Sequence, residues 1–289
     1  MNKLSSRKIG GRNAEDFQGN GEFARKAKDT ILVLSSPRSA TFNTTSAINR
    51  AAHAVIEGHS YSAQRTVDEI QAYFDQLIRS RIERDHQRAL NQVSEETIAE
   101  LRAALSDNNI FTVGEAATDY HNSNGSITCY GERISRRLYS RYFELKGIRH
   151  QSLSLESAVG FEEELATWTE GIAITGGYTA KEKLGSMLGY SDSKAALIAA
   201  LKGGELVIAK QTALHNDDPN KNPDTKVIPA ISFEEAEAVC GANGVVQSMV
   251  FDIIRKYGPG AAMLIVGADQ TQTRIHRPFL TPAQCQLAI

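Results

Sequence analysis

The sequence predicts an α/β protein with an open, mainly parallel sheet and helices packed on its faces. Two observations support this fold class. Short apolar, β-rich runs alternate with helical patterns along most of the 289 residues, an order typical of parallel sheets. Glycine clusters follow several of these runs, at the strand ends where ligands bind in such sheets. The length fits one large domain or two coupled lobes.

The strands are predicted where apolar runs are bounded by turn residues. The first covers residues 4–9 and is followed by Gly10 and Gly11. The second, TILVLS at 30–35, ends at Ser36-Pro37, a break signal. Three later runs predict strands at residues 171–175, 205–209 and 261–266. The sequence from Asp269 onward has little pattern, and we expect it to be loosely packed.

The helices are predicted from apolar residues at helical spacing. Residues 45–106 form a long amphipathic stretch, and Ser94 with the following Glu-Glu-Thr indicates that a new helix begins there. Further helices are expected at residues 133–146, 191–201 and 233–242, and Gly147 lies where a C-terminal cap belongs.

Composition argues against several classes of protein. The formal net charge of −2 gives no sign of nucleic-acid binding, which usually needs a basic patch. The three cysteines lie far apart, at spacings that suit neither disulfides nor zinc. The chain lacks a signal-peptide pattern and an apolar run long enough to cross a membrane. We therefore expect a cytoplasmic protein that binds neither nucleic acid nor membranes.

The common nucleotide-binding motifs G-x-x-x-x-G-K-[ST] and G-x-G-x-x-G are absent. What remains is a lysine beside a glycine pair, Lys8-Ile9-Gly10-Gly11, where free N–H groups and an ammonium could neutralise phosphate charge. Taken alone, the motif is more typical of a plain strand and turn with a surface lysine, because Lys-x-Gly-Gly is common.

Three other positions could carry chemistry, each with an ordinary alternative. Glu132 begins a helix and could bind an ammonium, or it could simply favour the positive helix end. Ser191 and Asp192 open another helix, as an anion site or as an N-cap. Lys210 follows a strand and precedes the loop at 217–221, which could contact a nucleotide or be solvated.

The order of these motifs is more specific than any one of them. RKIGG, ILVLSS, GERISRRLYSRYFELKG, ITGGYT, LGYSDSKAALIAAL and AKQTALHNDDPNKNPDTKVIPAISFEEA follow one another along the chain. Over residues 6–266 this series resembles aspartate kinase, of the amino-acid kinase family. The resemblance implies a three-layer α/β/α sandwich. It also implies an amino-acid lobe with a helical insertion at 1–170 and a nucleotide lobe at 171–289.

The resemblance also implies roles for individual residues. Lys8 would stabilise the transferring phosphoryl group of ATP, Asp192 would orient the catalytic lysine, and Glu132 would bind the substrate ammonium. Mg²⁺ would be held mainly by the phosphates. Nucleotide contacts are expected at Gly10, Gly11, Ser191, Lys210, Asp218, Pro219 and Lys221, and further substrate contacts at Arg12, Asn13, Gly176 and Gly177.

The chain departs from the family pattern near the expected substrate. Arg12-Asn13 replaces Thr-Ser, and Lys194 replaces a threonine. Leu188 replaces an arginine that pairs with the substrate α-carboxylate, a loss of about 2–5 kcal/mol of binding unless it is compensated. Our hypothesis is that Arg12 compensates for it. The chain ends before the family's usual regulatory domains, so feedback through such domains is not expected.

Three functions stay open at this point. The first is an ATP-dependent kinase that converts L-aspartate to 4-phospho-L-aspartate. The second is the same chemistry on another small carboxylate or an aspartate derivative, in a specialised pathway. The third is a non-catalytic subunit built on the kinase scaffold. We expect a homodimer in each case.

Overall fold

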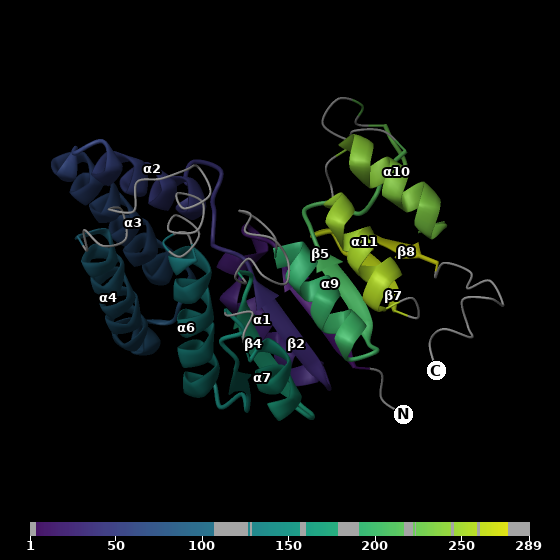
Figure 1. Ribbon diagram of the computed structural model, residues 1–289. Coiled ribbons are helices and arrows are strands. Elements are labelled where there is room, and N and C mark those ends of the chain that lie inside the picture. The colour runs from purple at the N-terminus through teal and green to yellow at the C-terminus, as the bar shows by residue number, and fades with distance from the viewer. Residues whose placement is uncertain are drawn as a thin grey trace. The chain divides into compact units, whose positions relative to one another are not determined.

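The computed structural model describes residues 4–106, 127, 129–156, 160–178, 191–216, 222, 224–243, 246–258 and 261–276. The chain forms two compact units, coloured along the sequence in Figure 1. We call Gly10–Ser191 the continuous unit, and Met1–Ile9 together with Asp192–Ile289 the split unit. The chain crosses between them twice, after Ile9 and after Ser191. The predicted lobes divide the chain at residue 170 instead, and that division stays a prediction.

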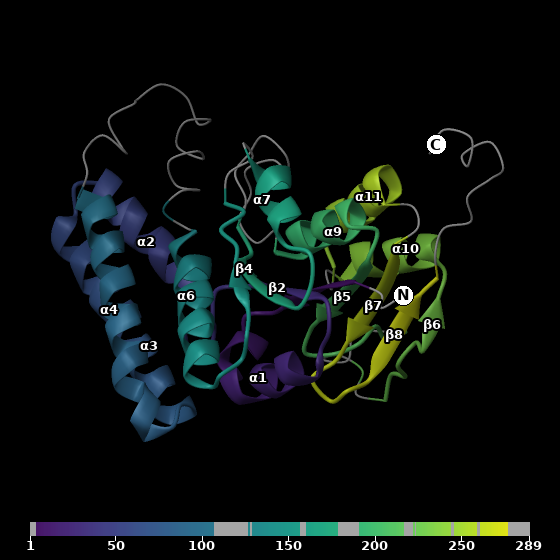
Figure 2. The ribbon, with the colours of Figure 1, turned by 90° about the horizontal axis from the view of Figure 1, so that it is seen from below.

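Three parallel strands, in the order β3-β4-β2, form the sheet of the continuous unit. They are β2 (Thr30–Leu34), β4 (Ile172–Gly176) and the short β3 (Gln151–Ser152). Every residue of β2 and β4 is buried, as expected for parallel strands covered on both faces. Helices α1 (Phe17–Lys26) and α7 (Phe161–Thr167) lie on opposite faces of these strands, which makes three layers (Figure 2).

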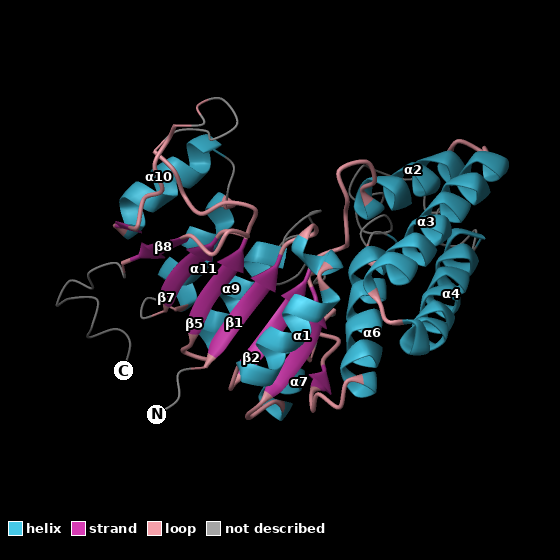
Figure 3. Cartoon of the chain, turned by 180° about the vertical axis from the view of Figure 1, so that it is seen from behind, coloured by secondary structure: helices cyan, strands magenta, loops and turns pink. Residues whose placement is uncertain are grey.

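The predicted amphipathic stretch folds into three helices of the continuous unit. They are α2 (Thr44–Ile56), α3 (Ser60–Arg81) and α4 (Arg84–Ser106), which lie side by side with α6 (Tyr130–Leu145), as Figure 3 shows. Gly147 follows α6 with φ of 66°, the left-handed conformation expected of a C-terminal cap.

The predicted helix start at Ser94 is wrong. Helix α4 continues through this residue, whose side chain is completely buried. Leu90, Ile98 and Leu101 are buried on the same helix, so one apolar stripe runs past Ser94 and keeps the helix intact. Tertiary burial therefore overrides the local start signal.

The split unit contains the strands in the order β1-β5-β7-β8-β6. Strands β1 (Ser5–Ile9), β5 (Glu205–Ala209) and β7 (Ala262–Val266) are parallel. Strand β8 (Gln272–Ile275) is antiparallel to β7 and parallel to β6 (Ala230–Ile231). Helices α9 (Ser191–Leu201) and α11 (Ser248–Tyr257) lie on one face of β5 and β7, and α10 (Phe233–Asn243) completes the unit (Figures 2 and 3).

The expectation of a loosely packed segment after Asp269 is wrong for the described part of it. Residues 272–275 pair with β7 along their whole length, and Thr273 and Ile275 are buried. Only two of the four side chains face inward, and one of them is polar, so the strand has no apolar run to reveal it. The mainly parallel α/β fold itself is confirmed. No described helix combines the length and the hydropathy needed to cross a membrane.

Candidate active site

Two lysines share one buried carboxylate in the split unit. Lys8 is the fourth residue of β1, Lys210 directly follows β5, and these strands are parallel neighbours. Asp192 lies in the first turn of α9. Its Oδ1 is 2.8 Å from Lys8 Nζ and its Oδ2 is 2.7 Å from Lys210 Nζ. The sheet and the helix thus bring together three residues that are remote in sequence.

This lysine–aspartate cluster carries an excess positive charge. The side chains of Lys8 and Asp192 are only 8% and 4% exposed, and that of Lys210 is 23% exposed. Burial lowers the pKa of Lys8 to about 8, although the charge of Asp192 works against this and that of Lys210 adds to it. Burial also opposes ionisation of Asp192, but the two ammonium groups prevail and hold its pKa below the usual value. Two cations around one anion leave a net charge of +1, which suits a phosphate.

Lys194, two residues after Asp192 on α9, is completely buried in the split unit. The family pattern described above has a threonine at this position. The helix that carries Asp192 therefore also carries a buried lysine.

A second set of candidate residues meets in the continuous unit, where β2 and β4 end. Leu34 and Gly176 are the last residues of these strands and lie opposite each other in the register. Glu132, in the first turn of α6, packs directly against Gly176, where an added Cβ would lie 3.1 Å from the Glu132 Cβ. Gly177 donates its N–H to Leu34 O at 2.7 Å, and a Cβ there would lie 2.5 Å from that of Ser191. Glycine is therefore required at position 177.

Ser36, which sequence reasoning treated only as a strand end, belongs to the same place. A Cβ on Gly131 would collide with Ser36 Oγ, and one on Gly11 would lie 2.7 Å from Ser36 O. Ser36 Oγ is buried and hydrogen-bonds to no residue in the described part of the chain. A buried hydroxyl without a hydrogen-bond partner among the described residues, packed against the residue that precedes Glu132, is a candidate substrate contact.

The neighbouring Ser35 ties the ends of three elements together. Its Oγ shares a hydrogen bond of 2.8 Å with Ser191 Oγ, and its carbonyl accepts one of 2.9 Å from Ser135 Oγ of α6. The signal for these serines in the sequence was the SSP break after β2, but nothing local distinguishes a site residue from a turn residue there.

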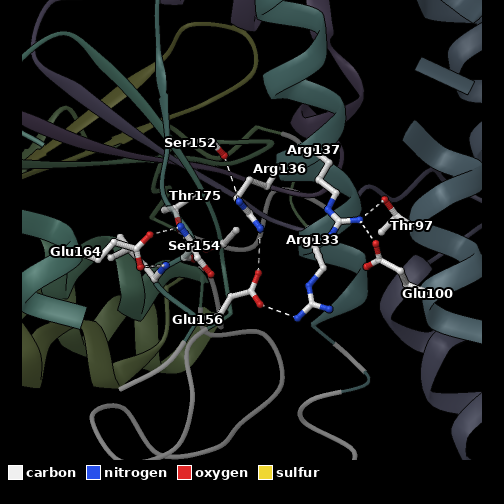
Figure 4. A network of polar contacts seen from close by, with 12 residues as sticks. Thr97, Glu100, Arg133, Arg136, Arg137, Ser152, Ser154, Glu156, Glu164 and Thr175 are labelled. Carbon is white, nitrogen blue, oxygen red and sulfur yellow. Dashed lines mark hydrogen bonds and ion pairs between the residues drawn. The ribbon is translucent and has the colours of Figure 1, made fainter. Parts of the chain in front are cut away.

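A charged network, drawn in Figure 4, holds the first turns of α6. Arg133 Nη2 is 2.7 Å from Glu156 Oε2, and Arg136 Nη2 is 3.5 Å from Glu156 Oε1. Arg136 also donates to Ser152 Oγ at 3.2 Å. On the other side of the helix, Arg137 pairs with Glu100 of α4 at 2.7 Å. Sequence reasoning did not identify this network.

The loop that carries Glu156 is itself fixed to β4 and α7. Thr175, next to Gly176, donates its hydroxyl to Ser154 O at 3.0 Å (Figure 4). Glu164 of α7 accepts the N–H groups of Ser154 at 2.5 Å and of Leu155 at 2.9 Å. Leu155 has a φ of 46°, which is unfavourable for a leucine, so these bonds stabilise a strained backbone. The network therefore connects Glu132 and Gly176, two predicted site residues, through α6 and β4.

The remaining predicted residues differ in what the structure says of them. Arg12 is exposed, directly after Gly11, and pairs with no carboxylate among the described residues. Asn13 begins the short helix η1 (Asn13–Glu15), where its carbonyl accepts a bond from Asn20. Gly10 and Gly11 precede it. The predicted nucleotide contacts Asp218, Pro219 and Lys221, like the departure at Leu188, lie outside the described residues.

Comparison with known proteins places this arrangement in a family. The family model named Amino acid kinase family matches residues 23–259. The chain belongs to the amino acid kinase family. No curated protein matches the sequence.

Solved structures of this family share the fold at low sequence identity. Aspartokinase III of E. coli, solved in complex with aspartate and ADP, superposes with a TM-score of 0.73 at 15% identity. The match covers 96% of this chain and 65% of that one, so the chain spans less than two thirds of this relative. UMP kinase from Ureaplasma parvum matches with a TM-score of 0.50 at 12% identity, over 95% and 99% of the two chains. The fold is therefore shared with kinases of more than one acceptor.

Proposed function

We propose that this kinase transfers the γ-phosphoryl group of ATP to the side-chain carboxylate of L-aspartate, giving 4-phospho-L-aspartate and ADP. The observation that carries the proposal is the buried lysine–aspartate cluster of the split unit. Its residues stand at the ends of two adjacent parallel strands and at the start of a helix, where α/β proteins bind their ligands.

The cluster supports phosphoryl transfer through charge. Negative charge develops on the oxygens of the phosphoryl group during transfer, and fixed cations stabilise it. Lys8 and Lys210 are such cations, and Asp192 fixes the positions of both ammonium groups. In the described part of the chain, no three His, Cys, Asp or Glu residues are grouped to hold a metal ion. We propose that Mg²⁺ is bound mainly by the phosphates of ATP, which also supplies the transferred group.

The residues of the continuous unit fit the amino-acid substrate. Glu132 offers a carboxylate to the substrate ammonium, Ser36 offers a hydroxyl, and Gly176 and Gly177 leave the backbone open to close approach. A carboxylate acceptor is already ionised at neutral pH, so its attack on the γ-phosphorus requires no general base. One acceptor oxygen bonds to phosphorus as the bond to ADP breaks.

The substrate α-carboxylate needs a cation. We assign it to Arg12, which is exposed, follows Gly11 and lacks a carboxylate partner in the described part of the chain.

A second candidate is a kinase of another small carboxylate or of an aspartate derivative. The replacement of the family's Thr-Ser by Arg12-Asn13 and of its arginine by Leu188 favours this alternative. An acceptor that lacks the α-carboxylate would need no substitute for the lost arginine.

Hydroxylamine trapping tests both proposals, because hydroxylamine converts acyl phosphates to coloured hydroxamates. The purified chain is incubated with ATP, Mg²⁺ and either L-aspartate, L-glutamate, N-acetyl-L-aspartate or succinate. We expect product with L-aspartate that is lost in Lys8→Ala and kept in Lys26→Ala, an exposed lysine of α1. Product with another acid alone would support the second candidate. No product and no ATP binding in calorimetry would favour the non-catalytic subunit.

The assembly and location of the protein also stay proposals. We propose a cytoplasmic homodimer, and light scattering coupled to size-exclusion chromatography measures its mass directly.

A further inference from the structure

A cavity lies within the continuous unit, on one face of α3. Its volume is about 530 Å³, within the range of sites for small molecules. Glu69, Tyr73 and Gln76 line it at helical spacing, together with Glu15 of η1 and Phe42. None of these residues is among those proposed above for ATP or the amino acid.

The charged groups that line this cavity are two carboxylates, Glu15 and Glu69, and one guanidinium, Arg81. Tyr73 donates its hydroxyl to Glu15 Oε1 at 2.5 Å, so the carboxylate is held in place at the wall. Glu15 is partly buried and forms no ion pair among the described residues. Glu69, in contrast, is exposed and already lies near Arg50 and Arg65, at 3.6 and 3.7 Å.

An aromatic pair stands beside that carboxylate. The rings of Phe42 and Tyr73 are stacked, with centroids 4.6 Å apart and an angle of 23° between their planes. Aromatic faces attract ammonium groups, and they also provide apolar contact for the carbon chain of a ligand. A fixed negative charge next to such faces is selective for a cation with an apolar body.

The two parts of the cavity wall that lie outside α3 are hydrogen-bonded to the glycine pair of the proposed phosphate site. Ala14 donates its N–H to Gly10 O at 2.8 Å, and Arg38 donates its N–H to Gly11 O at 3.2 Å. Ala14 precedes Glu15, and Arg38 precedes the lining residue Ser39. A ligand that orders these walls therefore also acts on the backbone at Gly10 and Gly11.

We propose that this cavity binds a small organic ammonium ion, with Glu15 as its counter-charge and the Phe42–Tyr73 pair as its apolar wall. All residues of the cavity belong to the continuous unit, so the binding itself does not depend on the split unit. The effect of binding on ATP, transmitted through Gly10 and Gly11, rests on the proposed kinase function.

Calorimetric titration of the full chain, without ATP, tests the binding. The probe is 2-phenylethylammonium, and its neutral counterpart 2-phenylethanol has the same shape without the charge. We expect heat from the ammonium only. Glu15→Gln should weaken binding by about tenfold or more, the worth of one charge-assisted contact. Phe42→Leu should weaken it by about twofold to fivefold.

The matched control is Glu22→Gln on α1, an exposed glutamate that also accepts one side-chain hydrogen bond, from Gln18 at 3.2 Å. It should bind the probe like the unmodified protein. Circular dichroism establishes that the variants are folded. Equal binding of the alcohol, unchanged binding by Glu15→Gln, or no heat at about 10 mM probe would each overturn the proposal.

The kinase assay separates binding from its consequence. If the chain is active, the ammonium should change the KM for ATP in the unmodified protein and in Glu22→Gln, but not in Glu15→Gln. An unchanged KM would refute the link to Gly10 and Gly11. An inactive protein would count against the kinase proposal alone, because the calorimetry needs no turnover.

Discussion

Replacing Asp192 by asparagine tests the lysine–aspartate cluster without any assumption about substrate. The change keeps the size of the side chain and removes its charge. Lys8 and Lys210, now 2.8 and 2.7 Å from a neutral amide, would face each other without a counter-charge. Breaking a buried ion pair in this way typically costs 3–5 kcal/mol, and we expect about 3 because Lys210 is partly exposed.

The dependence on pH makes the prediction specific. In the unmodified protein the folded-state pKa of Lys8 is about 8, below that of the unfolded chain. The unfolded chain therefore binds more protons above pH 8, and this residue makes the protein more stable as the pH rises toward its unfolded pKa. Without Asp192 the pKa of Lys8 falls further. The stability lost in Asp192→Asn should thus be largest near pH 6–7 and shrink toward pH 10, where Lys8 is neutral in both folded proteins.

Thermal unfolding at several pH values measures this effect. A loss of about 3 kcal/mol corresponds to a melting temperature lowered by roughly 6–12 °C near pH 7. The matched control is Asp252→Asn, which removes an exposed carboxylate 3.1 Å from Arg255 and should cost under about 0.5 kcal/mol. A shift of less than about 2 °C for Asp192→Asn, or one that does not change with pH, would refute the electrostatic reasoning.

Three further predictions concern the proposed reaction. Because Lys8 must be charged to neutralise phosphate, kcat/KM for ATP should fall about tenfold per pH unit above pH 8, and a profile flat to pH 10 would contradict the low pKa. Gly131→Ala should collide with Ser36 Oγ, raising the KM for the amino acid several-fold and lowering the melting temperature, whereas Gly58→Ala at an open turn should leave that KM unchanged. Glu156→Gln releases Arg133, the neighbour of Glu132, so it should raise the KM for the amino acid several-fold and leave the KM for ATP unchanged. Its control is Glu100→Gln, which removes the exposed partner of Arg137. Equal changes in both KM values would argue for a merely structural role of Glu156.

Local patterns in the sequence determined much of the fold. The strand at 205–209 and the helix at 191–201 have the predicted bounds, because apolar runs and the glycines that end them act over a few residues. The conformation of Gly147 was predicted for the same reason. Family membership followed from the order of the motifs, which is also written along the chain.

Only the tertiary structure decided how distant residues meet. The 2.8 and 2.7 Å contacts of Asp192 depend on which strands are neighbours in the sheet, and no local pattern specifies that neighbour. The same holds for Ser36 beside Gly131, for the arginines that hold Glu156, and for Glu15 against Tyr73, 58 residues away. Ser94 and β8 are cases in which the local sequence predicted the wrong structure, because burial and strand pairing outweighed the local pattern. Hydrophobic period and turn chemistry act between near neighbours, whereas pairing, burial and charge act between residues that only the folded chain brings together.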